Sequence, residues 1–168
     1  MPRKLLLICL LMIALIAAAY THFAHNLYYQ WLIPSKLEID NTLFVDVDLD
    51  WYAGGCGVAV YSLKPAIVSA INTKGIHFFD DALSAEEVRI FSKNRTVKYE
   101  DWQETPIPSN MFEGWPVGFT CASTSRKALF NEIVAHLHKP NSFFSRTDRG
   151  RLIFIIPEME IIVFTFFN

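Results

Sequence analysis

The sequence is poor in charged residues, and it has little glycine or proline. Asp, Glu, Lys and Arg make up 19% of its 168 residues, against about 25% in an average globular protein. Seven glycines and eight prolines exclude a collagen-like or glycine-rich chain, and the 52% hydrophobic share excludes a disordered tail. A net charge of −2 gives no electrostatic argument for nucleic acid as a partner. The composition therefore predicts one ordered domain and no particular activity.

The usual signatures of catalysis and nucleotide binding are also missing. The chain has no G-x-S-x-G, S-x-x-K or H-E-x-x-H motif, no P-loop and no G-x-G-x-x-G. These absences remove the common reasons to propose an enzyme, and no cofactor is expected.

Charge is absent from one long stretch near the N-terminus. Arg3 and Lys4 precede an uncharged run over residues 5–20, LLLICLLMIALIAAAY. As a helix this run is about 24 Å long, somewhat less than the roughly 30 Å of bilayer hydrocarbon. The helix can continue, because neither glycine nor proline occurs between Arg3 and Ile33. Tyrosine and tryptophan beyond the run suit the headgroup region of a membrane.

We therefore predict a single-pass membrane anchor over residues 1–33, in contact with the lipid bilayer through 5–33. The alternative is a cleaved signal peptide that ends near Ala19 and leaves a secreted soluble domain. The basic residues before the run predict a cytoplasmic N-terminus. Both interpretations place residues 34–168 outside the cytoplasm, which is the periplasm if the source is bacterial.

Only three cysteines are present. Cys9 lies in the apolar run, and Cys56 and Cys121 are predicted to form a disulfide in an oxidising compartment. The bond would close a loop of roughly 65 residues and stabilise the fold by about 4 kcal/mol in the chain-entropy model. The alternative is an envelope thiol hydrolase in which Cys56 acts with His77 or His136.

The patterns in residues 34–168 predict one α+β domain, with a mainly antiparallel sheet and about three packed helices. We expect strands at 43–51, 57–62, 76–79 and 117–122, and a hairpin of two central strands over 151–167. We expect helices at 64–72, 126–137 and, from a capping box at Ser84–Glu87, at 84–93. Proline-rich residues 100–118 are expected to form a loop or an edge of the sheet.

Three aspartates are a weak candidate metal site. Asp46, Asp48 and Asp50 alternate along the first strand, so they would lie on one face of it. Carboxylates in a row can bind a divalent cation, but the spacing is not that of an EF-hand loop. The alternative is an ordinary solvated strand face.

Two tryptophans are weak candidates for a binding surface. Trp102 and Trp115 lie in the expected loop region, where exposed aromatic side chains can contact a protein or another ligand. We therefore expect a contact surface over residues 101–118. The general alternative is that these aromatic residues belong to the core.

Charge is unevenly distributed along the chain. Residues 114–168 carry six basic and four acidic side chains, whereas residues 36–113 carry seven basic and thirteen acidic ones. This asymmetry can steer a charged partner or a lipid headgroup, and ordinary solvated charge is the alternative. Together the patterns predict a small membrane-anchored envelope protein that acts as a non-enzymatic binding module.

Overall fold

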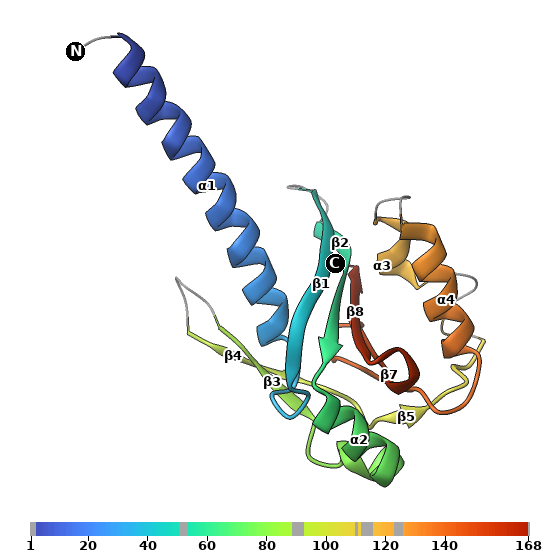
Figure 1. Cartoon of the computed structure of the whole chain (residues 1–168). Coiled ribbons are helices and arrows are strands. Elements are labelled where there is room, and N and C mark those ends of the chain that lie inside the picture. The colour runs from blue at the N-terminus through green and yellow to red at the C-terminus, as the bar shows by residue number, and fades with distance from the viewer. Residues whose placement is uncertain are drawn as a thin grey trace.

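A six-stranded antiparallel sheet forms the middle of the domain, in the order β1-β2-β8-β7-β6-β5 (Figure 1). The computed structural model describes residues 3–50, 54–88, 93–109, 111, 116–122 and 126–167, with their side chains except at 3–6, 17, 21–25, 49, 50, 54, 87 and 117. The strands of this sheet are β1 (Ile39–Asp50), β2 (Gly54–Leu63), β5 (Gln103–Glu104), β6 (Phe143–Arg146), β7 (Leu152–Ile156) and β8 (Ile161–Phe167).

Helices and a second, two-stranded sheet cover the six-stranded sheet. The small sheet pairs β3 (Ser84–Glu87) with β4 (Arg95–Lys98). The helical elements are α1 (Arg3–Trp31), α2 (Pro65–Lys74), the 3-10 helix η1 (Gly75–Phe79), α3 (Val117–Thr120), α4 (Lys127–Leu137) and the 3-10 helix η3 (Pro157–Met159). The predicted α+β domain with a mainly antiparallel sheet and a few helices is thereby confirmed.

One face of the sheet packs against the end of α1. Tyr29 in the last turns of α1 stacks on Phe166 of β8, with ring centroids 5.1 Å apart. Leu32 and Ile33 are buried in the same cluster, and the hydroxyl of Tyr99 donates a hydrogen bond to the carbonyl of Leu32. The end of α1 is therefore part of the domain core, held by both apolar and polar contacts.

The other face packs against α3 and α4. Phe130 of α4 stacks on Phe119 of α3 with centroids 4.5 Å apart, and both are fully buried together with Ile133 and Leu137. Because both faces of the sheet are covered, β7 and β8 are apolar on both sides. This confirms the prediction that the hairpin over 151–167 supplies central strands.

Two glycines allow α3 to lie directly on the sheet. A Cβ atom at Gly118 would overlap the carbonyl oxygen of Gly57 in β2 and lie 2.8 Å from Cβ of Thr165 in β8. The predicted disulfide joins the same two elements: Cys56 in β2 is bonded to Cys121 after α3, with Cα atoms 5.9 Å apart. Small residues and a covalent bond thus hold α3 in place.

The expected helix at 84–93 is wrong, because its first residues form strand β3. Ala85 pairs with Val97 of β4, and both are buried. Glu86 accepts a hydrogen bond from the side chain of Asn94, an interaction within the hairpin. Pairing and burial of alternate residues outweigh the local capping signal, which contributes only about 1 kcal/mol.

Two expected strands are helical turns. Residues 76–79 lie in η1, because Phe78 and Phe79 are both buried in the same cluster, whereas neighbouring residues of a strand would point to opposite faces. Residues 117–120 form α3, which begins directly after Pro116; proline before a first turn favours helix. Sequence reasoning also missed β4 and β6, although it placed α2 and α4 correctly.

The N-terminal part of α1 projects away from the domain (Figure 1). Among the side chains that the structure describes, no helix is both long and apolar enough to cross a membrane. The predicted membrane span thus has no support from this finding. Lipid contact through residue 33 also needs correction, since Tyr29, Leu32 and Ile33 are buried by the domain itself.

Candidate functional site

An open groove of about 490 Å³ lies between the end of α1 and the small sheet, within the usual size range of ligand pockets. Its lining comes from three separate parts of the chain: Gln30, Trp31, Ile33, Ser35, Ser84, Ala85, Glu86, Val88 and Thr96. We call this feature the α1–β3 groove.

Both walls of the α1–β3 groove are fixed by the fold. On one side, Gln30 donates a hydrogen bond of 3.0 Å to the hydroxyl of Thr42 in β1, and a tight turn follows in which Leu37 N–H bonds to Pro34 C=O. On the other side, antiparallel pairing to β4 sets the direction of β3. The groove is therefore formed before any ligand arrives.

The chemistry of the α1–β3 groove suits polar binding. Three hydroxyl-bearing residues, Ser35, Ser84 and Thr96, line it together with Trp31, so residues able to form hydrogen bonds and one aromatic residue are available. Its carboxylate, Glu86, accepts a hydrogen bond of 3.0 Å from Asn94. Such a lining fits a neutral polar ligand or an extended peptide segment.

The aspartate row is only partly within the described residues. Asp46 lies opposite Val58 and Asp48 opposite Cys56 on the same face of β1, as predicted from the alternation. Asp46 is half-buried and Asp48 is exposed, while the side chain of Asp50 is outside the described part. Within the described residues, no group of three His, Cys, Asp or Glu side chains is arranged to hold a metal ion.

Trp102 is a core residue, which corrects the expectation that it is exposed. Only 8% of it is exposed, and its ring stacks on Phe79 with centroids 4.4 Å apart. Its Nε1 donates a hydrogen bond of 2.9 Å to the carbonyl of Ala82. The other candidate, Trp115, lies outside the described residues.

The structure does not bring the components of a thiol hydrolase together. The sulfur of Cys56 is in the disulfide, and a disulfide sulfur is not a nucleophile. From Cys56 to its last residue, Leu63, strand β2 is about 23 Å long. His77 lies beyond that far end, after α2. His136 lies 3.4 Å from Glu158 of η3, also at that far end. Neither histidine adjoins the cysteine.

Sequence reasoning missed a buried arginine beside buried tyrosines. Burial raises the pKa of Tyr29 and Tyr99, and the positive charge of Arg151 lowers both in part. Arg151 itself is only 6% exposed. The sequence pattern indicates this burial: Arg151 precedes Ile153 and Ile155 at strand spacing and so shares their buried face.

The structure thus shows a groove beside the end of α1 and a buried arginine at the turn before β7. The chain matches no protein-family model, no curated protein and no solved structure.

Proposed function

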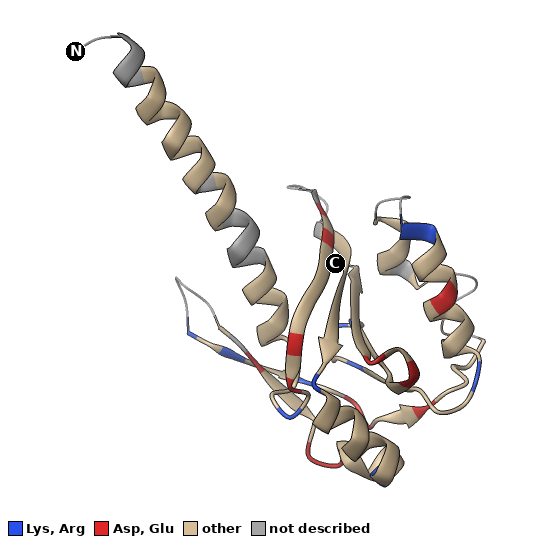
Figure 2. Ribbon diagram, viewed as in Figure 1, with Lys and Arg blue, Asp and Glu red and all other residues tan. Residues whose placement is uncertain are grey.

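We propose that the protein is a membrane-anchored binding module, in which the N-terminal part of α1 inserts into lipid and the α1–β3 groove receives a polar ligand. The observation that supports insertion is a run of large apolar side chains, each more than half exposed: Leu7, Ile8, Leu10, Leu11, Met12, Ile13, Leu15 and Ile16. In the parts of the chain that Figure 2 colours, Lys, Arg, Asp and Glu lie in the domain and not along α1. We call the run of exposed apolar side chains from Leu7 to Ile16 the apolar arm.

The apolar arm is exposed on every side, which favours lipid over a protein groove. Successive residues of a helix point about 100° apart, so the exposed Leu7, Ile8 and Ile13 point in three directions roughly 120° from one another around the axis. A helix that binds one groove, or that lies flat at an interface, has a polar face as well. Only a surrounding apolar medium covers the whole arm, at a gain on the order of 10 kcal/mol.

Two further features support placing the domain outside the cytoplasm. Arg3 and Lys4 precede the arm, and basic residues at one end of an inserted segment favour the cytoplasmic side. The Cys56–Cys121 disulfide persists in oxidising compartments and is rare in the cytosol. Both features agree with the predicted extracytoplasmic domain.

The binding role is proposed from the α1–β3 groove. The last turn of α1 forms one wall of it, so a ligand there would be held directly beside the inserted helix. Its hydroxyls and indole offer hydrogen bonds and stacking, which supports binding of a polar ligand. This placement suits a module that presents or captures a partner at a membrane surface.

Insertion is tested by two pairs of matched substitutions. The variant Leu11→Asp/Leu15→Asp places two charges in the arm, one turn apart, and each disfavours insertion by about 3 kcal/mol. We expect it to bind phosphatidylcholine vesicles more than 100-fold more weakly than the wild type in a flotation assay. The control Leu43→Asp/Leu83→Asp changes the same residue types at exposed positions of the domain and should float like the wild type. Equal flotation of both variants would refute insertion.

A further inference from the structure

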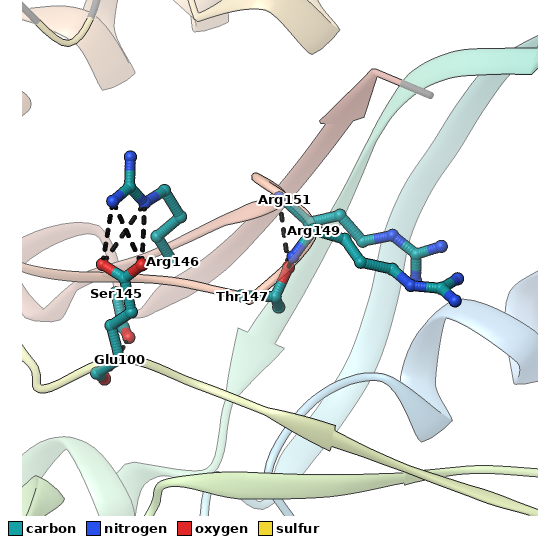
Figure 3. Close-up of polar contacts among 6 residues, drawn as sticks. All are labelled: Glu100, Ser145, Arg146, Thr147, Arg149 and Arg151. Atoms are coloured by element: carbon teal, nitrogen blue, oxygen red, sulfur yellow. Dashed lines mark hydrogen bonds and ion pairs between the residues drawn. The ribbon is translucent and has the colours of Figure 1, made fainter.

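Two arginines on the turn between β6 and β7 extend in the same direction. Figure 3 shows the side chains of Arg149 and Arg151 pointing away from the Arg146–Glu100 ion pair, toward the side where α1 lies. Their positions are two residues apart on a short turn. The arrangement therefore directs two positive charges to one region of the molecule.

Thr147 fixes this turn from inside the protein. Its hydroxyl accepts hydrogen bonds from the backbone N–H groups of Arg149 (3.3 Å) and Arg151 (3.1 Å), and only 1% of the residue is exposed. The backbone N–H of Thr147 bonds to the carbonyl of Arg151, and Gly150 takes the left-handed conformation that closes the turn. The two side chains therefore start from a rigid base.

The described residues supply no counter-charge to this pair. The Nε atom of the buried Arg151 has no hydrogen-bond partner, and no described carboxylate forms an ion pair with either arginine. Its neighbours Tyr29 and Tyr99 are neutral near pH 7, because burial raises the pKa of each phenol.

The other arginines with described side chains are engaged elsewhere. Arg146 contacts Glu100 through several nitrogen atoms. Arg95 lies 3.8 Å from Asp148. Arg126 lies 4.1 Å above the ring of Phe44. Among the arginines with described side chains, Arg149 and Arg151 therefore differ from the others in having neither a carboxylate nor an aromatic ring as a partner.

The Nε atom of Arg151 is buried without an acceptor, and such an unsatisfied donor is unfavourable. Removing this donor from water without a bonding partner is costly, and a second positive charge on the same side adds repulsion. A bound oxyanion would relieve both effects, and the guanidinium fork matches phosphate in shape as well as charge. We propose that Arg149 and Arg151 form a binding site for a phosphate group.

The phosphate can come from a lipid headgroup or from a soluble phosphate. Arg151 acts electrostatically on Tyr29, so the site lies beside the end of α1, close to where the apolar arm leaves the domain. That position suits a headgroup, whereas the shared chemistry is the phosphate oxyanion. The site stands on the arginine geometry and does not depend on the proposed anchoring.

Inorganic phosphate tests the site directly. For the full chain in nonionic detergent, we expect phosphate to raise Tm by about 3 °C over chloride at equal ionic strength. The variant Arg149→Gln should weaken phosphate binding roughly tenfold and remove this rise, because it loses a charge-assisted contact. The control Arg146→Gln removes the same charge from an arginine that is already paired and should keep the rise. Arg149 is exposed, so its substitution leaves the core intact.

Vesicles test the lipid source. The full chain is reconstituted in digalactosyldiacylglycerol, which has no phosphate, with or without phosphatidylglycerol. A Tm rise with phosphatidylglycerol alone assigns the site to headgroups, a rise with inorganic phosphate alone assigns it to soluble phosphates, and a rise with both supports the shared chemistry. The proposal is overturned if neither raises Tm, or if Arg149→Gln responds as strongly as Arg146→Gln. Failure of flotation by the apolar arm would leave the inorganic phosphate result unaffected.

Discussion

Replacing Cys56 and Cys121 with alanine should lower the free energy of unfolding by about 4 kcal/mol. The two cysteines are 65 residues apart, so the bond removes much of the unfolded chain's freedom. It also joins β2 to the end of α3, two elements that pack on each other through glycines. A typical domain is stable by only about 5–15 kcal/mol, so loss of the disulfide would remove a large part of the free energy of unfolding.

Urea unfolding of the full chain in nonionic detergent measures this effect. The matched control is Cys9→Ala, because Cys9 is a free, exposed cysteine, and its free energy of unfolding should stay within about 0.5 kcal/mol of the wild type. If the double variant unfolds at the same urea concentration as the control, the disulfide does not stabilise the domain as we describe.

Replacing Gly118 with alanine should cost about 3 kcal/mol of stability. The new Cβ would overlap the carbonyl oxygen of Gly57 and lie 2.8 Å from Cβ of Thr165. One of these neighbours is backbone and the other is the branch point of a side chain, so neither can rotate away. To make room, α3 must lift from the sheet and disturb the contact between Phe119 and Phe130.

The substitution Gly75→Ala is the control for the loss of a glycine. A Cβ at Gly75 would meet nothing within 4 Å, although its φ of +56° favours glycine. Because its ψ of −138° also lies in a region nearly restricted to glycine, the cost should be about 2 kcal/mol, from backbone strain alone. Thermal unfolding compares the two variants. Equal losses of Tm would mean that close contact between α3 and β2 is not what Gly118 provides.

Those parts of the fold with strong periodicity could be predicted from the sequence. The stripe that includes Phe130 and Ile133 identifies α4, and the doubly apolar strands of the hairpin identify the centre of the sheet. The Ser84 capping box failed because a weak local signal met strong pairing between Ala85 and Val97. Phe78 and Phe79 were misassigned for a similar reason, since only the tertiary structure shows that both face one cluster.

The candidate sites were harder to predict, because they form between distant segments. The α1–β3 groove joins residues near 30 to residues near 85, and each contributes side chains that are common on any surface. Trp102 is indistinguishable in sequence from an exposed tryptophan, since the acceptor of its N–H is the distant Ala82 carbonyl. The buried Arg151 could have been recognised from strand alternation with Ile153, but its missing partner could not.

Reactivity of the native Cys9 thiol tests membrane insertion most directly. Cys9 lies in the apolar arm and is free, and N-ethylmaleimide crosses membranes but needs the thiolate, a charge that hydrocarbon excludes. The reference is Ser35→Cys in a Cys9→Ser background, because Ser35 is exposed just beyond α1. In phosphatidylcholine vesicles we predict that Cys9 reacts at least about tenfold more slowly than the cysteine at position 35. Equal rates at the two positions would contradict insertion of the arm.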